Sequence, residues 1–388
     1  MDIFELDGKY IAGTYKRFPV AAVSGKGSVI VDGNGKEYID MGSGIGVTSF
    51  GIADDAWQKA VTDQIALIQH ASNLYYTKPC AELAKTLCER TGMKKVFFSN
   101  SGAEANECAI KAARKYASDK YGKERFVIAT LTGSFHGRTL TTLAATGQQK
   151  FHELFTPLTD GFVSFDAGDA AALTELAKSG TLAGVMIECV QGEGGVIPLD
   201  GAFVKEVEAI CEKYDVILVV DEVQTGNGRT GELYSYMHFG IKPDVVSTAK
   251  GLGGGLPIGA TLLGDKCEGV FNPGDHGSTF GGNPVSCAAA LSVIGRIDGD
   301  LLEGVKKKSE YIFSELDGAP GIERVDGLGL MIGIKTKKEA AKVVAECIEK
   351  GVLCLTAKDK VRLLPALNID DGLLAKAIAV IKEVSAAK

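Results

Sequence analysis

The stretch "ILVVDEVQTG", residues 217–226, joins four apolar residues directly to two carboxylic acids, Asp221 and Glu222. A short run of aliphatic, mostly β-branched residues predicts a buried strand that ends at Asp221. Ligands of open α/β sheets bind outside the carboxyl ends of the strands. We therefore expect Asp221 to lie at a ligand site.

A second stretch, "VVSTAKGLGGG", residues 245–255, repeats this arrangement with the opposite charge. Here an apolar strand runs into Lys250, which is surrounded by small residues and glycines. An acid that closes one strand and a lysine that closes the next are expected to meet at one edge of the sheet. An ion pair between Asp221 and Lys250 in the core is the alternative.

A third segment at this edge, "SNSGAEANE", residues 99–107, follows a predicted strand and opens a predicted helix. Ser101, with Glu104 three residues later, has the pattern of a capping box. The free N–H groups of Gly102 and Ala103, together with the helix dipole, also suit a phosphate. This segment alone leaves both interpretations open.

The strands are short and apolar on both faces, and they alternate with amphipathic helices from about residue 55. This pattern predicts an α/β fold with a mostly parallel central sheet covered by helices on both sides. The predicted strands are 94–98, 125–130, 183–188, 216–221 and 245–249, and the predicted helices are 54–71, 103–117, 169–177 and 202–214.

The two ends of the chain predict a smaller α+β unit. "GSVIVDGNGKEYIDM", residues 27–41, contains a hairpin turn signal. Another helix is expected to begin at Pro284, with Asn283 as its N-cap. We predict an N-terminal segment, 1–50, that packs with a small C-terminal domain, 276–388, and shares its sheet. The large α/β domain is expected to span 51–275.

Composition narrows the classes of partner and compartment. The net charge of −7 argues against nucleic acid, and no apolar run approaches the length of about 18 residues that spans a membrane. The N-terminus lacks the features of a signal peptide, and the nine cysteines form no CxxC pair. Reduced thiols in the cytoplasm are therefore expected. Five scattered histidines without HExxH predict no metal site.

Two motifs point to other chemistries. "GNGRTG", residues 226–231, fits the GxGxxG fingerprint of a nicotinamide-dependent oxidoreductase, but Asp244 precedes its strand where the fingerprint needs an acid that ends one. "STAK", residues 247–250, fits the SxxK of serine acyl-enzymes, but its serine closes a strand and the SDN and KTG partners are missing. A non-catalytic binding protein would not need both Asp221 and Lys250.

Pyridoxal phosphate is the cofactor that needs an acid, a lysine and an anion seat together. Its aldehyde bonds to a lysine, its ring nitrogen pairs with an acid, and its phosphate needs backbone donors. Asp221, Lys250 and the helix start at Gly102 supply these three groups at one predicted edge.

Seven segments then carry a resemblance to the class III, fold-type I aminotransferases, which use pyridoxal phosphate. They occur in the family's order over nearly the whole chain: "NSGAEANE" (100–107), "SFHGRT" (134–139), "VQGEGGV" (190–196), "VDEVQTGNGRTG" (220–231), "STAKGLGGGLPIGA" (247–260), "HGSTFGGNP" (276–284) and "VRLLPALNI" (361–369). "HASNLYYTKP" (70–79) and the compact length resemble the acetylornithine subgroup. "GIADDAW" (51–57) replaces the family's usual Gly-His-x-His-Pro turn, and we expect this departure to affect local packing.

The resemblance implies roles for the residues that would hold the cofactor. Lys250 would bond to it and later carry a proton, and Asp221 would pair with the ring nitrogen. The remaining cofactor contacts implied are Gly102 and Ala103 at the phosphate, Phe135 and Val223 on the two ring faces, Gln224 at the ring hydroxyl, and Thr279 reaching the phosphate from the other subunit of a homodimer.

For substrates, the resemblance implies that Arg138 and Arg362 bind carboxylates, which suits the bidentate guanidinium group. Ser278 would touch the substrate, and Glu193 would pair with Arg362 when no α-carboxylate is present. The implied ping-pong reaction moves the ω-amino group of N2-acetyl-L-ornithine to 2-oxoglutarate, giving N-acetylglutamate 5-semialdehyde and glutamate in arginine biosynthesis. Ornithine, succinylornithine and 4-aminobutyrate are alternative donors, and loops near 10–20 and 70–76 are expected to decide among them.

Overall fold

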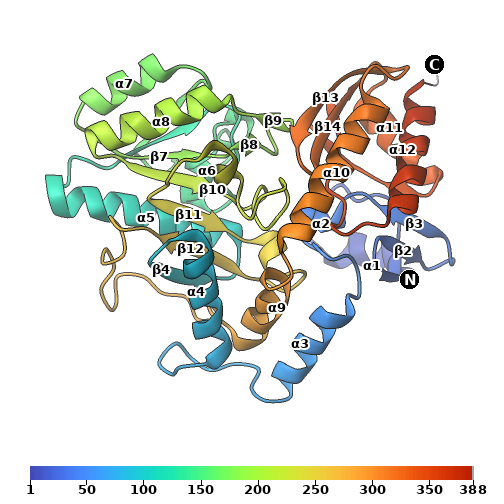
Figure 1. Cartoon of the computed structure of the whole chain (residues 1–388), viewed down its shortest axis with the longest axis horizontal. Coiled ribbons are helices and arrows are strands. Elements are labelled where there is room, and N and C mark those ends of the chain that lie inside the picture. Colours follow the sequence, from blue (N-terminus) through green and yellow to red (C-terminus); the bar gives the residue numbers. More distant parts are fainter. Residues whose placement is uncertain (387–388) are drawn as a thin grey trace.

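A seven-stranded sheet forms the centre of the larger part of the molecule in the computed structural model, which describes residues 1–386 (Figure 1). Its strand order is β4-β12-β11-β10-β7-β5-β6. β12 runs antiparallel to both of its neighbours, and all other pairs between β11 and β6 are parallel, which confirms the predicted mostly parallel sheet. The strands are β4 (Lys95–Ser99), β5 (Val127–Leu131), β6 (Phe162–Phe165), β7 (Leu182–Ile187), β10 (Ile217–Asp221), β11 (Val245–Thr248) and β12 (Gly259–Leu263).

Strand β10 shows why this sheet is apolar on both faces. Its five residues are all buried, but alternate ones belong to different cores. Ile217 and Val219 pack in a cluster with residues of α5 (Gly102–Tyr121), whereas Leu218 and Val220 pack with residues of α7 (Ala170–Lys178) and α8 (Gly201–Tyr214). Successive side chains of a strand point to opposite faces, so two helical layers cover the sheet.

The other helices around this sheet are α3 (Asp55–Ile65), α4 (Lys78–Thr91), α6 (Leu140–Ala145) and α9 (Pro284–Ile294). The predicted cap of α9 is confirmed, because the Asn283 side chain accepts hydrogen bonds from Val285 N and Ser286 N. The predicted helix 54–71 ends early, at Ile65. There the amides of Leu67 and Ile68 turn back to the carbonyl of Gln64.

The chain ends form two further sheets. β1 (Ala22–Lys26), β2 (Val29–Asp32) and β3 (Glu37–Asp40) are antiparallel, and β15 (Val352–Leu353) pairs in parallel with β3. The second sheet has the order β13-β14-β17-β16, with bounds Ile322–Leu328, Met331–Thr336, Lys360–Leu363 and Leu355–Ala357. The expectation that the N-terminal hairpin shares a sheet with the C-terminal unit therefore holds for β15 and is wrong for the other four strands, which form a sheet of their own.

Helices α10 (Gly299–Leu316), α11 (Ala340–Glu349) and α12 (Asp371–Ala386) share a core with the C-terminal sheet and with Tyr38 and Met41 of the N-terminal segment. α9 packs instead with α3 and α4, in the core of the large sheet. The division into domains stays a prediction, and we propose that its boundary falls between α9 and α10.

Short elements complete the described chain. They are α1 (Ile3–Tyr10), α2 (Ser43–Gly46), the hairpin of β8 (Val190–Gln191) and β9 (Ile197–Pro198), and the 3₁₀ turns η1 (Gln149–Phe151), η2 (Ser235–Phe239) and η3 (Lys250–Leu252). In the unusual segment 51–57, Ile52 bridges to Gly27 and Asp54 caps α3, while Trp57 Nε1 donates a hydrogen bond to the distant Gly253 carbonyl at 2.9 Å. None of the helices in residues 1–386 has the length and apolar character needed to cross a membrane.

Candidate active site

A cleft of about 690 Å³ lies at the carboxyl edge of the large sheet and is lined by ten of the twelve predicted site residues. These ten are Gly102, Ala103, Phe135, Arg138, Glu193, Asp221, Val223, Gln224, Lys250 and Arg362. Parallel strands present their carboxyl ends to the same edge, which is why residues so far apart in the chain meet here.

Asp221 ends β10 and is almost fully buried at one wall of the cleft. Its Oδ2 accepts hydrogen bonds from Asn106 Nδ2 and His136 Nδ1, each at 2.8 Å, and its Oδ1 accepts one from Val223 N at 2.9 Å. Burial alone would lower the pKa of His136, but the hydrogen bond to Asp221 and the charges of Asp221 and Glu188 together raise it. Three donors thus fix this carboxylate.

Glu222, the next residue, turns to the other face of the sheet and does not line the cleft. Its Oε1 accepts hydrogen bonds from Ser235 Oγ at 2.7 Å and Tyr236 N at 2.9 Å, and its Oε2 accepts one from Thr225 Oγ at 2.6 Å. The two acids that close β10 therefore have separate tasks: Asp221 faces the cleft, and Glu222 ties the following turn to the fold.

Lys250 begins η3 in a left-handed backbone conformation, with φ of 45°. Such a conformation is strained for a residue with a side chain and is characteristic of functional sites. Burial lowers the pKa of Lys250, and the nearby Arg362 guanidinium lowers it further against the opposing effect of Glu193. A lowered pKa leaves more of the amine neutral and nucleophilic.

The start of α5 is consistent with both interpretations of its sequence, a helix cap and a phosphate site. Ser101 Oγ accepts a hydrogen bond from Glu104 N, so the predicted cap is present, although the Glu104 carboxylate reaches Asn100 N rather than Ser101 N. A Cβ atom on Gly102 would lie 2.6 Å from Val223 Cγ1, so only glycine fits beside this side chain. The amides at the first two positions of a helix have no partner within it, and here they line the cleft.

The Phe135 loop forms another wall. Phe135 N donates a hydrogen bond to Glu188 Oε2 at 2.9 Å, and the Phe135 ring packs edge-on against Phe151. The Arg138 guanidinium is exposed and lies 5.7 Å from the centre of the Phe135 ring. An arginine above an aromatic ring at the mouth of the cleft can reach an incoming carboxylate.

Arg362, on β17, enters the cleft from the C-terminal sheet and is nearly fully buried. Its Nη1 donates to Glu193 Oε1 at 2.5 Å and to Gln224 Oε1 at 3.1 Å. Burial would raise the pKa of Glu193, but Arg362 holds it below its ordinary value. The predicted partners Arg362 and Glu193 therefore meet as an ion pair, and Gln224 in this structure bonds to Arg362.

The structure does not bring Ser278 and Thr279 into the cleft of the same chain. Ser278 Oγ accepts a hydrogen bond from Asn100 Nδ2 at 3.2 Å, and Thr279 is exposed. The roles of both residues stay predictions that depend on a second subunit.

Sequence reasoning missed three residues that support the site. Asn106 lies one helical turn after Gly102, on the same face of α5, and His136 follows Phe135 directly, so both had a detectable signal. Glu188 had the same signal as Asp221, since an apolar strand, β7, runs into it. Its oxygens accept from Phe135 N and Gly192 N, and burial raises its pKa to about 7.

The competing motifs do not form the structures that their chemistries need. Residues 226–231 lie in successive turns that lead to η2, so no α-helix follows them to receive a dinucleotide phosphate. Ser247 is buried inside β11, away from any helix start.

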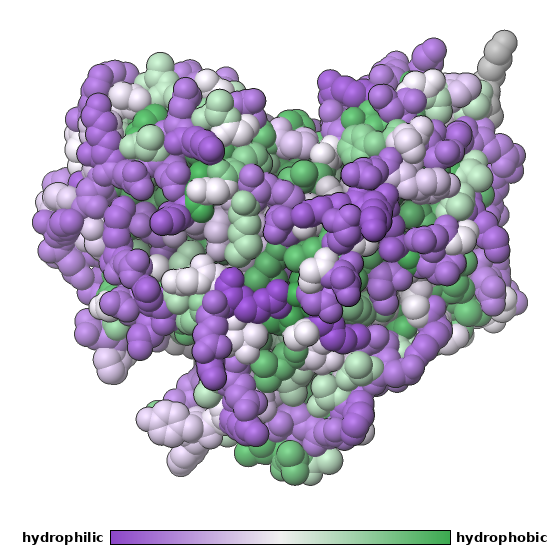
Figure 2. Space-filling model, viewed as in Figure 1, coloured by the Kyte–Doolittle hydropathy of each residue, from purple (hydrophilic) through white to green (hydrophobic). Residues whose placement is uncertain are grey.

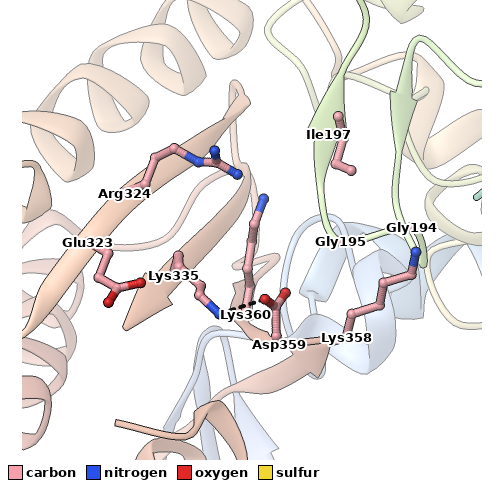
Figure 3. Close-up of a pocket in the computed structure, with 9 residues that line it drawn as sticks. All are labelled: Gly194, Gly195, Ile197, Glu323, Arg324, Lys335, Lys358, Asp359 and Lys360. Carbon is pink, nitrogen blue, oxygen red and sulfur yellow. Dashed lines mark hydrogen bonds and ion pairs between the residues drawn. The ribbon is translucent and has the colours of Figure 1, made fainter. Parts of the chain in front are cut away.

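A second groove, of about 540 Å³, lies on the outer side of the loop that carries Glu193 (Figure 3). Gly194 and Gly195 form one wall of it, and cationic side chains of the C-terminal sheet form the other. Lys335 pairs with Asp359 at 2.6 Å, and Lys360 pairs with Asp326 at 2.6 Å. Lys335 and Lys360 thus already have carboxylate partners, and none of the predicted site residues lines this groove, so we assign the chemistry to the cleft that holds Lys250.

An acid, a lysine and a helix N-terminus at one edge of this α/β sheet define a pyridoxal-phosphate-dependent enzyme of fold type I. Residues 10–384 match the model of the aminotransferase class-III family, and the chain belongs to that family. It is therefore an aminotransferase with pyridoxal phosphate as its cofactor, and the buried Asp221, the strained Lys250 and the helix N-terminus at Gly102 and Ala103 on the cleft wall fit that group.

Its relatives share nearly the whole chain. It is 49% identical to the acetylornithine aminotransferase of Haemophilus ducreyi, over 98% of both chains. It is 45% identical to that of Aquifex aeolicus, over 97% of this chain and 99% of the relative. Among solved structures, it resembles ornithine aminotransferase from Toxoplasma gondii (TM-score 0.94, 30% identity, 98% and 94% covered) and acetylornithine aminotransferase from Elizabethkingia anophelis (TM-score 0.87, 30% identity, 98% and 97% covered).

Proposed function

We propose that the enzyme transfers the ω-amino group of N2-acetyl-L-ornithine to 2-oxoglutarate, giving N-acetylglutamate 5-semialdehyde and glutamate in arginine biosynthesis. The observation that carries the two-substrate reaction is the ion pair of Arg362 and Glu193 inside the cleft. The names of the relatives that share more than 40% of the sequence support the choice of donor.

When bound, pyridoxal phosphate supplies an aldehyde that bonds to amines and a ring that accepts electrons from the substrate carbon. Lys250 would hold the cofactor through its amine, and the same amine, when free, would accept the proton of the substrate carbon. The lowered pKa of Lys250 prepares it for both tasks. Asp221, fixed by Asn106 and His136, would hold a proton on the ring nitrogen.

The remaining cleft residues position the cofactor. Gly102 and Ala103 present amides to the phosphate, and Thr279 of a second subunit completes that seat. Phe135 and Val223 enclose the ring, a role supported by their place on the cleft wall. Gln224 would exchange its bond with Arg362 for one to the ring hydroxyl.

Arg362 and Glu193 let one cleft accept two different donors. Glutamate brings an α-carboxylate to Arg362, whereas the ω-amine end of acetylornithine brings only a methylene chain there. An unpaired guanidinium would then be a costly buried charge. Glu193 neutralises it in that half-reaction and swings away for glutamate, while Arg138 binds the distant carboxylate of acetylornithine.

This gate predicts opposite effects on the two half-reactions. Glu193→Ala should leave Arg362 open, so that glutamate reacts as well or better and the ω-amine donor reacts more slowly. Arg362→Ala should damage the glutamate half selectively. Single-turnover rates with each donor test this, and equal losses in both halves would rule out a gate.

A donor screen with 2-oxoglutarate, with glutamate measured as the product, tests the choice of substrate. We expect acetylornithine to have the highest kcat/KM, ahead of succinylornithine, ornithine and 4-aminobutyrate. A higher value for ornithine would assign the enzyme to a sibling specificity. Thr14, Tyr15 and Lys16, which lie in a loop expected to decide among donors, do line the cleft.

We further propose a cytoplasmic homodimer, a compartment supported by nine free thiols. Large apolar side chains gather at the loop between α3 and α4, near the lower edge of the face in Figure 2. Asn73 bonds this loop to the carbonyls of Ser278 and Gly281, and the exposed Phe280 beside Thr279 packs against His70, which extends the apolar surface into the Thr279 loop. Such a surface favours a second copy that shares Thr279.

Complementation tests the shared site. Lys250→Ala and Thr279→Asp each spoil a different half of one composite site. Co-folded heterodimers of the two inactive variants should regain activity at one site in two. Absence of complementation would show that each site is built from a single chain.

A further inference from the structure

Arg229, in the "GNGRTG" turn, is a buried cation that pairs with no carboxylate among the described residues. Its side chain is about 2% exposed, and burial lowers its pKa to about 10. Its Nη1 donates to the carbonyls of Leu330, at 3.1 Å, and Pro365, at 2.5 Å. Keeping a charge inside the protein for two carbonyl partners is costly, so this residue calls for an explanation.

The two carbonyls flank neighbouring strands of the C-terminal sheet. Leu330 directly precedes β14, and Pro365 follows β17 by two residues. β14 and β17 are antiparallel, and Gly333 of β14 lies opposite Arg362 of β17. A single guanidinium thus joins the adjacent ends of the strand that carries Arg362 and of its neighbour.

Main-chain contacts strengthen the same link between the turn that contains Arg229 and the C-terminal sheet. Leu330 N donates to the carbonyl of Arg229 at 2.9 Å. Gly329, with φ of 58°, lies so close to Thr230 that a Cβ atom on it would be 2.4 Å from the Thr230 carbonyl carbon. The turn that follows Asp221 and Gln224 is therefore locked to the sheet that carries Arg362.

We infer that Arg229 is a positioning residue for substrate recognition, which sets the place of Arg362 relative to the cofactor-binding turn. The inference rests on the proposed role of Arg362 as the site of the glutamate α-carboxylate. Arg362 bonds to Gln224 at the cleft, and Arg229 joins the same two segments behind it. A bidentate clamp tolerates little displacement, so loosening the rear joint weakens glutamate binding.

Lysine cannot replace arginine here. The ammonium group is a compact, strongly hydrated charge, whereas guanidinium is planar and more weakly hydrated, so it can be buried against two carbonyls at lower cost. Arg229→Lys keeps the charge and removes the joint. This variant therefore distinguishes an effect caused by a shift of β17 from an effect caused by losing the positive charge.

Arg125 provides a matched control. It is also a buried arginine whose side chain donates to carbonyls, those of Leu182, Tyr214 and Asp215. These lie at the starts of β7 and β10, on the opposite edge of the large sheet from the cleft. Arg125→Lys should lower thermal stability without any preference between the two substrates.

The experiment measures both half-reactions of the holoenzyme by single turnover, for Arg229→Lys, Arg125→Lys and Arg362→Lys. In Arg229→Lys, we expect the glutamate concentration for half-maximal rate to rise at least tenfold. The limiting rate with acetylornithine should change less than threefold. Arg125→Lys should leave the ratio of the two half-reactions unchanged at a similar loss of Tm.

Equal losses in both half-reactions of Arg229→Lys, or no loss, would overturn the inference. If Arg362→Lys spares the glutamate half, the proposed role of Arg362 fails. If Arg362→Lys impairs that half and Arg229→Lys does not, only the positioning role fails. Should Arg229→Lys not fold, Arg229→Met buries no charge and removes the same joint, and the same selective loss is expected of it.

Discussion

Asp221 and Glu222 are consecutive acids on one strand, and they end up in opposite surroundings. Asp221 faces the cleft and is held by Asn106, His136 and its own turn. Glu222 faces the opposite core and is held by Ser235, Tyr236 and Thr225, away from the cleft. Both acids are buried and hydrogen-bonded, so burial alone does not identify a catalytic acid. What distinguishes Asp221 from Glu222 is that Asp221 lines a cavity.

The largest effect on turnover is expected from Lys250, which lines the same cleft as Asp221. Lys250→Ala should lower turnover by several orders of magnitude, because it removes the group that moves the proton, while cofactor binding persists. Steady-state rates and the visible absorption of the purified variant measure the two effects. In the wild type, borohydride should fix the cofactor to the peptide that contains Lys250. Turnover within tenfold of the wild type would contradict this assignment.

Asp221→Asn should lower turnover by about 10³-fold, since it keeps the shape of the side chain and loses the charge that holds the ring-nitrogen proton. The Tm should stay within a few degrees, because the amide still fills the same space. The rate of proton abstraction in single turnovers checks the first expectation, and thermal unfolding checks the second. Near wild-type turnover would mean that Asp221 does not partner the ring.

Glu222→Ala should show the reverse pattern and so sharpen the comparison. It leaves Tyr236 N and two hydroxyl groups without their acceptor, which should cost at least about 2 kcal/mol of unfolding free energy. Turnover of the folded enzyme should fall less than tenfold. Urea unfolding with parallel kinetics tests this, and a loss of activity as large as that of Asp221→Asn would abolish the distinction.

Glu188 should give an effect that depends on pH. Fewer donors hold it than hold Asp221, and burial raises its pKa from the ordinary 4.5 to about 7. The native state therefore binds this proton more tightly than the unfolded state does. Unfolding free energy should fall as pH rises from about 4.5 to about 7, by about 3 kcal/mol.

Glu188→Gln cannot titrate and should lack this share of the pH dependence. Comparing the variant with the wild type between pH 5 and pH 8, without added cofactor, cancels the contribution of groups that do not interact with Glu188. The difference includes the part of the His136 titration that depends on the Glu188 charge. Parallel pH profiles for the two proteins would show that Glu188 keeps its charge in the folded state.

Much of the site could be predicted because it depends on local order along the chain. Asp221 and Lys250 each follow an apolar strand, and Gly102 opens a helix after another. Parallel strands bring such positions to one edge whatever lies between them. The α/β class and the sheet's two covered faces follow from the same alternation. β6 and β12 were not predicted, because four or five residues with few β-branched side chains give little signal.

What the sequence alone determined is which residues stand at strand ends and helix starts, since strand and helix periods set the face of each side chain. Only the tertiary structure decided their partners. His136 reaches Asp221 across 85 residues, Glu193 reaches Arg362 across 169, and Arg229 reaches Pro365 across 136. Such pairs depend on how separately folded segments pack, and no local pattern records that geometry.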